Sequence, residues 1–236
     1  MLYSLSDQDI LFPSPRLCAH PSGVLAVGGD LRPERLLLGY SLGLFPWYSE
    51  GHTPPLWHAP HERMALFPER LVVNRSLRRA LNRNDFEVRY DTAFEEVLEG
   101  CAGAPRPGQD GTWLHAPLRA GLLALHRAGY AHSAEAWLGG ELVGGLYGVT
   151  LGRVFFGESM FTRVSDASKV AFVTLVRELV ALGYTLIDCQ AYTDNLARFG
   201  AEELEGELFY ELLCDLTARA PRAVWPTGAG ERRADP

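Results

Sequence analysis

Residues 131–190 decide the fold, and they read AHSAEAWLGG ELVGGLYGVT LGRVFFGESM FTRVSDASKV AFVTLVRELV ALGYTLIDCQ. Apolar and β-forming residues gather here into four runs separated by turn residues, and Gly139-Gly140 favours a tight hairpin between the first two. Between the third and fourth runs apolar residues recur at helical spacing, and Gly183 ends that helix. The stretch therefore predicts strands over 131–137, 141–150, 154–161 and 186–190, with a helix over 167–182.

The rest of the chain divides into two parts. The first sixty or so residues are rich in proline, glycine and aromatics, and they contain one expected helix, from Pro33 to Gly43. We expect a small loop-rich N-terminal domain over 1–64 and a larger sheet domain over 65–236. Further expected elements of the larger domain are helices at 76–81, 92–101, 117–128 and 195–199 or 207–216, a flexible loop at 105–111 and a disordered tail at 227–236.

The composition is that of a globular protein, with 236 residues, 47% of them hydrophobic, and a net charge of −7. This charge argues against nucleic-acid binding through the whole surface, but it allows a local basic patch. No apolar stretch is long enough to cross a bilayer and no signal peptide is present, so we expect a soluble cytoplasmic protein. Neither a metal site nor a disulfide framework is expected, because no C-x-x-C pair occurs among Cys18, Cys101, Cys189 and Cys214.

The order of strands and helix in 131–190 resembles the N-acyltransferase superfamily built around acetyl-CoA. The resemblance implies an α+β fold with a GNAT-like mixed sheet, and acyl transfer to an amine. The segment before the long helix, Thr162-Arg163-Val164-Ser165-Asp166, lacks the pair of glycines that lets backbone amides hold a pyrophosphate. We therefore expect an acyl donor other than coenzyme A, and no cofactor.

Three clusters carry candidate chemistry. The loop around Trp47 offers a flat ring on which a base can stack, worth ~1–3 kcal/mol, although such loops more often pack in a core. Glu158 is a carboxylate inside an apolar strand, which is costly unless it is paired or used. Asp188 and Gln190 stand at the exit of a buried strand, a common location for a reacting centre. From the residues alone, structural hydrogen-bonded carboxylates are the favoured interpretation of Glu158 and Asp188.

Taken together, these clusters resemble the leucyl/phenylalanyl-tRNA–protein transferase family. The resemblance covers most of the chain in the family's order, and the set of motifs is specific although each one is weak alone. The resembling stretches are Gly28-Gly29-Asp30-Leu31, Phe45-Pro46-Trp47, Thr112-Trp113, Leu125-His126, Ala131-His132-Ser133, 142–149, 156–161, Ala167-Ser168-Lys169 and 186–190.

The resemblance implies transfer of Leu or Phe, with Met as a further candidate, from aminoacyl-tRNA to proteins that begin with Arg or Lys. The product would be marked for N-end rule degradation. Gln190 would accept a hydrogen bond from the attacking amine, Asp188 would orient and polarise Gln190, and Glu158 would hold the acceptor's amine or the donor's ribose. The ester is already activated, so holding the reactants in line, worth roughly 7–11 kcal/mol, is the main requirement. The implied partners are Leu-tRNA, Phe-tRNA and acceptor proteins, with no membrane, and we expect a monomer.

The matching positions also imply a donor site. Trp47, Trp113 and Tyr40 would hold the terminal adenosine of the tRNA. An apolar pocket would select the amino acid by ~1–3 kcal/mol per methylene and reject polar side chains. The same apolar residues are equally typical of a packed helix-on-sheet core, and most of them must serve both as core and as pocket lining. They are Leu146, Phe155, Phe172, Leu175, Leu179 and Ile187.

Four arginines at helical spacing are the candidate contact to the tRNA backbone. A basic helix face is usually only solvated, but the acidic remainder of the chain makes this patch the best candidate. The four are Arg75, Arg78, Arg79 and Arg83.

The chain departs from the family's pattern at the edge of the donor site. His58 follows Trp57 where the family has a second Trp, and Leu122 replaces a Tyr. Two other functions stay open: a coenzyme A-dependent N-acetyltransferase, and a noncatalytic module that binds charged tRNA or N-terminal peptides.

Overall fold

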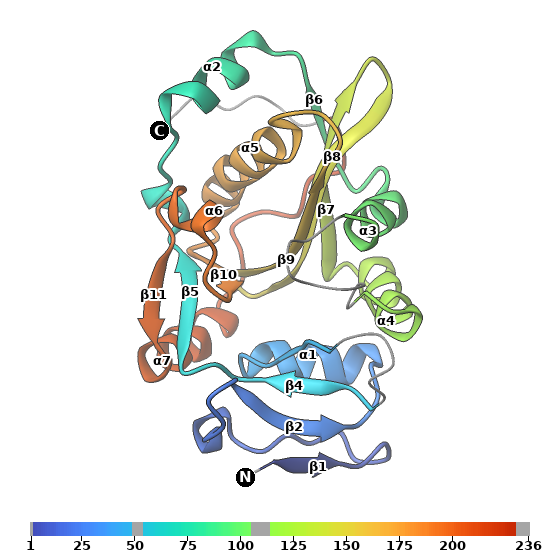
Figure 1. The fold of residues 1–236 in the computed structure, drawn as a ribbon, viewed down its shortest axis with the longest axis vertical. Helices are drawn as coiled ribbons and strands as arrows, with labels where there is room; N and C mark the ends of the chain where they lie inside the picture. The colour runs from blue at the N-terminus through green and yellow to red at the C-terminus, as the bar shows by residue number, and fades with distance from the viewer. Residues whose placement is uncertain (1, 49–53, 105–113, 230–236) are drawn as a thin grey trace.

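Two β-sheets organise the chain, and Figure 1 shows the smaller one at one end of the molecule. The computed structural model describes residues 2–48, 54–104 and 114–229. A four-stranded sheet in the order β1-β2-β4-β3 holds the N-terminal part, and an eight-stranded sheet in the order β11-β5-β10-β9-β8-β7-β6-β12 holds the rest. The large sheet is mixed, since β10 pairs parallel to β9 and antiparallel to β5. The structure thus confirms the coarser part of the expected α+β fold, namely that helices are combined with a mixed sheet.

The small sheet is built from short strands around a buried tryptophan. Trp57 is fully buried, and its indole N–H donates to the carbonyl oxygen of Gly28 at 3.0 Å. The helix expected after Pro33 forms as α1 (Pro33–Ser41). The strands were not predicted, because such short runs containing proline and glycine carry no readable alternation. They are β1 (Tyr3–Leu5), β2 (Val24–Gly28), β3 (Phe45–Pro46) and β4 (Leu56–His58), with a 3-10 helix at Pro15–Leu17.

The division expected between residues 64 and 65 falls inside a strand of the large sheet. β5 (Glu62–Leu66) pairs with β10 and with β11, whereas the small sheet ends at His58. Residues 62–64 therefore pair within the large sheet and not with the N-terminal part. The strand was missed because two charged residues, Glu62 and Arg63, stand in front of its short apolar run.

The large sheet contains the predicted meander. β7, β8 and β9 pair antiparallel in sequence order, and the predicted hairpin joins the first two, with Gly139 at φ +60° and Gly140 at φ +86°. Two consecutive positive φ angles are the requirement of a type I′ turn, which glycine meets without strain. The strands are β6 (Glu87–Tyr90), β7 (Ala131–Leu138), β8 (Glu141–Leu151), β9 (Val154–Thr162), β10 (Leu186–Gln190), β11 (Glu202–Glu205) and β12 (Gly228–Ala229).

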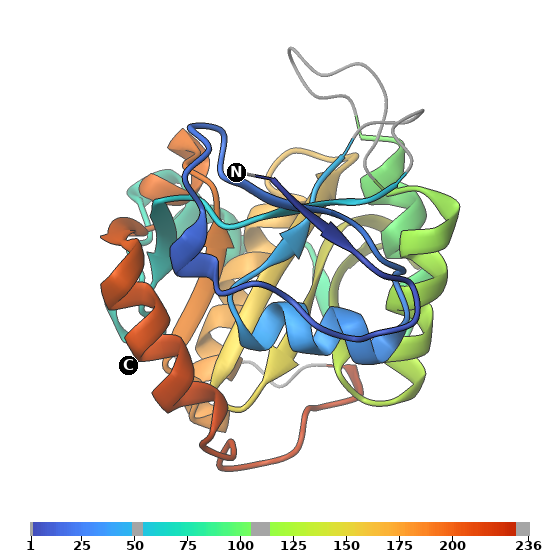
Figure 2. The same cartoon turned by 90° about the horizontal axis from the view of Figure 1, so that it is seen from below.

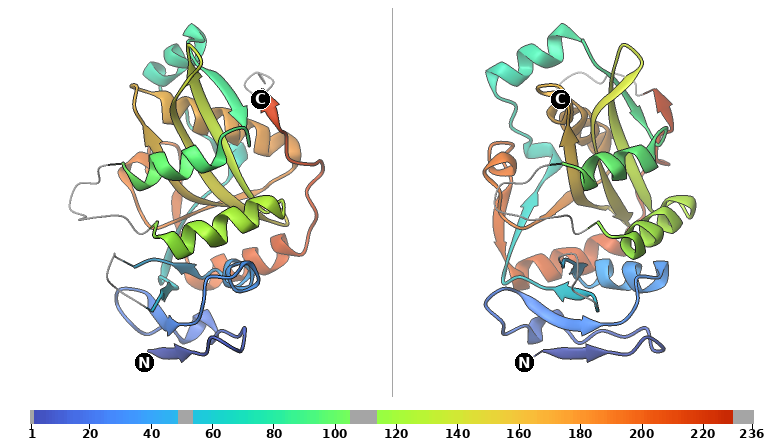
Figure 3. Two further views of the ribbon diagram at one scale, coloured as in Figure 1. Left: turned by 90° about the vertical axis from the view of Figure 1, so that its right-hand side faces the viewer. Right: turned by 45° about the vertical axis from the view of Figure 1, so that its right-hand side comes forward.

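Helices cover both faces of the large sheet (Figure 3). The buried apolar residues that the structure describes form two clusters. The long helix α5 packs on one face against β7 and β8, while α3 and α4 pack on the other. From below, Figure 2 shows α1 beside the large domain, where it packs against α4 and α7. The bounds are α2 (Arg75–Arg83), α3 (Phe94–Ala102), α4 (Ala116–Arg127), α5 (Ala167–Leu182), α6 (Asp194–Ala197) and α7 (Gly206–Thr217), with a 3-10 helix at Pro68–Arg70.

The C-terminal part differs from expectation in one respect. Both candidate last helices form, as α6 and α7. The tail expected to be disordered begins with β12, which pairs with Tyr90 and Arg89 of β6, so that expectation was wrong for Gly228 and Ala229. Residues 230–236 and the loop expected at 105–111 lie outside the described residues. Within the described ranges, no helix is long and apolar enough to cross a membrane.

Candidate active site

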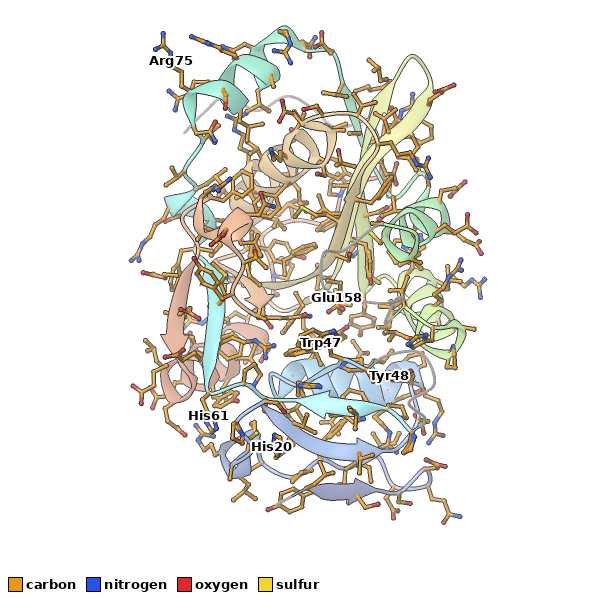
Figure 4. The ribbon with its side chains drawn as sticks, viewed as in Figure 1. His20, Trp47, Tyr48, His61, Arg75 and Glu158 are labelled. Atoms are coloured by element: carbon orange, nitrogen blue, oxygen red, sulfur yellow. The ribbon has the colours of Figure 1, made fainter. Side chains whose placement is uncertain are left out.

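A cavity opens where β9 and β10 separate. The two strands pair only between Val154–Phe156 and Leu186–Asp188, after which β9 runs on to Thr162 and the chain after β10 turns into α6. The cavity has a volume of about 430 Å³, with walls from β3, β8, β9, α5 and the segment after β10. Figure 4 shows Trp47 and Glu158 facing each other where the two sheets meet.

A β-bulge places Glu158 at this cavity. In the pairing of β8 with β9, Tyr147 is opposite Ser159 and Gly148 is opposite Gly157, so Glu158 is an extra residue without a partner across the ladder. A bulge bends its strand and redirects a side chain out of the regular alternation. The Glu158 side chain consequently lines the cavity although the residues around it belong to an otherwise apolar strand.

A second bulge shapes the end of β10. In its pairing with β5, Asp188 is opposite Ala65 and Gln190 is opposite Met64, so Cys189 is the extra residue. Gln190 adopts φ +62°, a left-handed conformation that is uncommon for residues other than glycine. Such conformations persist where surrounding contacts fix them, and they concentrate at functional sites. The second bulge thus places Gln190 in the cavity wall, opposite β9.

Glu158 joins three parts of the chain through hydrogen bonds. Its Oε1 accepts from the Tyr40 hydroxyl at 3.0 Å and from Nε2 of Gln190 at 2.7 Å. Because Nε2 donates to Glu158, the Oε1 of Gln190 is the acceptor that this side chain can present to a ligand. Tyr40, expected to contact adenosine, is instead 1% exposed in α1 and does not line the cavity. Its position supports a role in holding Glu158.

Asp188 lies behind the cavity in a buried ion pair with Arg63. The Arg63 Nε donates to Oδ1 at 2.7 Å and Nη2 donates to Oδ2 at 2.6 Å, with both side chains at most 1% exposed. The guanidinium also lies over the rings of Phe45, at 4.6 Å, and Phe209, at 4.9 Å. Oδ1 of Asp188 further accepts the backbone N–H of Gln190 at 2.9 Å. Asp188 therefore orients Gln190 through the backbone rather than through the side-chain amide.

The electrostatics of the cavity favour a carboxyl group that titrates near neutrality. Burial raises the pKa of Glu158 to about 7, against the hydrogen bond from Tyr40, which favours the charged form. The charge of Asp188 raises this pKa further, while Arg63 and the hydrogen bond from Gln190 lower it. Burial also raises the pKa of the Cys189 thiol far above its usual range, so this cysteine is a poor nucleophile.

Four of the six residues expected to form the apolar pocket line the cavity: Leu146, Phe155, Phe172 and Ile187. The other two, Leu175 and Leu179, are buried in the core about one and two turns further along α5. Helical spacing in the sequence places all three α5 residues on one face, but it does not say how far the cavity extends along the helix axis. Leu175 and Leu179 therefore lie on the expected face of α5 but outside the lining of this cavity.

Trp47 lines the cavity and is 39% exposed, so part of its ring is available for stacking. His58, one of the departures from the family's pattern, donates from Nε2 to the carbonyl oxygen of Trp47 at 2.8 Å. Its ring also packs against the Trp47 indole, with 5.5 Å between centroids. His58 thereby supports the Trp47 loop. The other expected adenosine contact, Trp113, lies outside the described residues.

The four candidate phosphate-binding arginines all lie on α2 and are all exposed. Arg83 pairs with Asp85 at 2.9 Å. Figure 4 places Arg75 at the end of the molecule away from Trp47 and Glu158. The patch and the cavity are therefore separate surfaces, and one ligand would have to be large to contact both.

Family comparisons match both parts of the chain. The model described as leucyl/phenylalanyl-tRNA protein transferase matches residues 65–214, and the model of that family's N-terminal domain matches residues 29–61. The chain belongs to the leucyl/phenylalanyl-tRNA–protein transferase family. The transferase of Myxococcus xanthus is 53% identical, over 100% of this chain and 99% of its own, and that of Chromobacterium violaceum is 50% identical, over 90% and 91%. Among solved structures, L-PGS from Bacillus licheniformis is similar with a TM-score of 0.40 and 15% identity, over 73% of this chain and 57% of its own.

Membership of the leucyl/phenylalanyl-tRNA–protein transferase family makes the chain an enzyme, an aminoacyltransferase. Among the described residues no group of three or more His, Cys, Asp or Glu side chains is placed to hold a metal ion. The principal residue that the sequence reasoning missed is Arg63, the partner of Asp188. Its signal was an arginine immediately before Met64-Ala65-Leu66, a charge that must find a partner if that run is buried.

Proposed function

We propose that this aminoacyltransferase moves Leu or Phe, and also Met, from aminoacyl-tRNA to the α-amino group of proteins with N-terminal Arg or Lys. The single observation that carries the proposal is one cavity lined by both apolar and polar side chains. Leu146, Phe172 and Ile187 are among its apolar lining residues, and Glu158 and Gln190 are among its polar ones. An amino-acid side chain would pack against the apolar residues, leaving its ester carbonyl beside the polar ones.

The reaction needs positioning more than acid–base catalysis. The acceptor's amine nitrogen would attack the ester carbonyl carbon, forming the C–N bond as the C–O bond to the ribose breaks, and the ribose oxygen would leave with a proton. Oε1 of Gln190 would accept a hydrogen bond from the attacking amine, because Nε2 already donates to Glu158 at 2.7 Å. An amide is too weak a base to remove the proton alone, so Gln190 aligns the nucleophile. Glu158, with a pKa of about 7, would attract the acceptor's amine or hold the donor's ribose.

Donor selection would follow from the apolar walls. Polar side chains would lose their hydration without gaining partners, and small apolar ones would fill the space poorly. Trp47, 39% exposed at the cavity, would stack on the terminal adenosine, and Trp113 would be its second contact. The arginines of α2 would contact phosphates of the tRNA body, since they are exposed and clustered within an acidic chain.

We also propose a GNAT-like fold for the large domain, adapted to a donor other than coenzyme A. The parallel pair β9 and β10, which separates to form the cavity, supports the likeness. The segment 162–166 before α5 has no glycine, which argues against a pyrophosphate site there. We further propose a cytoplasmic, monomeric enzyme whose products enter N-end rule degradation.

The deciding experiment mixes the purified protein with radiolabelled Leu-tRNA and two acceptors that differ only in an N-terminal Arg or Ala. The expected result is label on the Arg-starting acceptor and none on the Ala-starting one. A parallel reaction with labelled acetyl-CoA should leave both acceptors unlabelled. Absence of label from the Arg-starting protein would refute the proposal, and binding of either ligand without transfer would indicate a noncatalytic module.

A further inference from the structure

The segment after α7 crosses the large sheet on the face that carries α5 and reaches the opposite edge as β12 (Figure 3). Along the way, Nε of Arg153 donates to the carbonyl oxygen of Ala220 at 2.9 Å, and the backbone N–H of Arg222 donates to the carbonyl oxygen of Leu182 at 2.7 Å. The family model matches only as far as residue 214, so this segment lies beyond it. These hydrogen bonds attach the segment to the turn between β8 and β9 and to the end of α5, and β12 attaches it to β6.

One side chain of this segment, Trp225, is partly buried and packs against the core among four aromatic rings. Its indole is nearly parallel to the rings of His132, at 4.1 Å and 17°, and Phe155, at 5.9 Å and 11°. The rings of Tyr90, at 6.1 Å, and Tyr184, at 6.4 Å, meet it edge-on. Stacked and edge-to-face geometries are both favourable for aromatic pairs, so the indole is held from several directions.

His132 is itself fixed, and it therefore fixes Trp225. The Nδ1 of His132 lies 2.7 Å from Oδ2 of Asp91, and Nε2 lies 3.2 Å from the carbonyl oxygen of Gly129. Both neighbouring groups are acceptors, and the shorter contact, to Asp91, orients the imidazole plane. The stacked indole consequently has a rigid surface beside it.

Phe155 is the ring through which this arrangement reaches the cavity. It lines the cavity, yet it is only 1% exposed. The Phe155 ring packs directly on the backbone of Gly148 in β8. A Cβ atom at position 148 would lie only 2.4 Å from the Cζ of Phe155, so only glycine leaves space for the ring there. Phe155 therefore has the sheet at Gly148 and the indole of Trp225 as neighbours behind the cavity wall.

We propose that Trp225 is a specificity-determining residue, which holds Phe155 in place as a wall of the aminoacyl cavity and so limits the size of the donor's amino acid. Trp225 does not line the cavity, so it acts through Phe155 and is a positioning residue. The inference rests on the proposed function, because it assigns this cavity to the donor's side chain. Shortening Trp225 leaves an apolar void behind Phe155, and the ring can move back into it to enlarge the cavity.

The test compares kcat/KM for Leu-tRNA, Phe-tRNA and a tRNA charged with Trp in the wild type and in Trp225→Ala, with an Arg-starting acceptor. The expected result is a rise of about tenfold in the Trp-to-Leu ratio, since apolar walls discriminate about 10–200-fold per methylene. Trp225→Phe, which keeps a ring, should keep the wild-type ratio. Trp137→Ala is the matched control, because that indole packs under Arg89, at 4.6 Å, and does not line the cavity.

A purely structural role would lower kcat/KM for all three donors by the same factor, and an unchanged ratio in Trp225→Ala would therefore overturn the proposal. If the alanine variant does not fold, Trp225→Leu leaves a smaller void and is judged by the same ratio. Failure of the proposed function is distinguishable, since the wild type would then transfer none of the three amino acids.

Discussion

The buried ion pair between Arg63 and Asp188 provides the most demanding test of how the site is held. Replacing Arg63 with Met removes two donors, at 2.7 and 2.6 Å, from a carboxylate that is 0% exposed. Breaking a buried pair by removing one partner costs about 3–5 kcal/mol, because the remaining charge is buried without compensation. Domains unfold with a free energy of about 5–15 kcal/mol, so Arg63→Met should lose a large part of its stability.

The double variant Arg63→Met/Asp188→Leu separates stability from activity. Replacing a buried ion pair by apolar side chains is often neutral, so the double variant should recover most of the lost free energy of unfolding. It should nevertheless transfer amino acids slowly, because the backbone N–H of Gln190 loses the acceptor that lies 2.9 Å away in the wild type. Compared with Arg63→Met, the double variant would then regain free energy of unfolding without regaining the rate of transfer.

Urea unfolding and transfer of labelled Leu measure the two properties in the wild type, Arg63→Met and the double variant. A loss under about 1 kcal/mol in Arg63→Met, the value of an exposed ion pair, would refute the reasoning on stability. A double variant with wild-type activity would refute the link from Asp188 to Gln190.

Three further predictions concern charge. The pKa of Glu158 is raised from 4.5 to about 7 in the folded state, so its contribution to stability is present below pH 4.5 and is lost as the pH rises through 7. The Tm of Glu158→Gln should therefore rise relative to the Tm of the wild type as the pH increases from 4.5 to 7. A Tm difference that does not change with pH would contradict this assignment. Asp188→Ala should slow transfer far more than it weakens tRNA binding measured by filter retention, and an equal loss of both would disprove a role in positioning. Replacing Arg78 and Arg79 with Ala should weaken tRNA binding and reduce the slope of log K against log[salt] by about 2, at roughly 0.9 per phosphate contact, and an unchanged slope would move the tRNA surface elsewhere.

Local pattern was sufficient to predict the regular part of the large domain. The helix 167–182 and the strand 186–190 form with the expected bounds, because helical apolar spacing with a glycine stop encodes the first and a short run led by Leu186 and Ile187 encodes the second. The strands of the small sheet were not predictable in this way. Two to five residues around Pro46 or Gly28 become strands only when a neighbouring strand supplies hydrogen bonds.

The sequence also identified Glu158, Asp188 and Gln190 as candidates, since polar side chains in apolar strands need a partner or a use. It did not predict how they relate. The contact of Glu158 with Tyr40 joins residues 118 positions apart, and the pair of Asp188 with Arg63 joins residues 125 apart. Neither separation leaves a periodic signal in one sequence.

By itself, then, the sequence determined the family, the meander with its helix and final strand, and the polar residues at the end of that strand. The tertiary structure alone decided which side chains face the cavity, because two β-bulges, at Glu158 and Cys189, interrupt the alternation by which a strand assigns its residues to faces. It also decided that Tyr40, Leu175 and Leu179 lie in the core instead of the cavity wall. Periodicity gives the direction of a side chain, whereas the packing of distant segments sets where a cavity begins and ends.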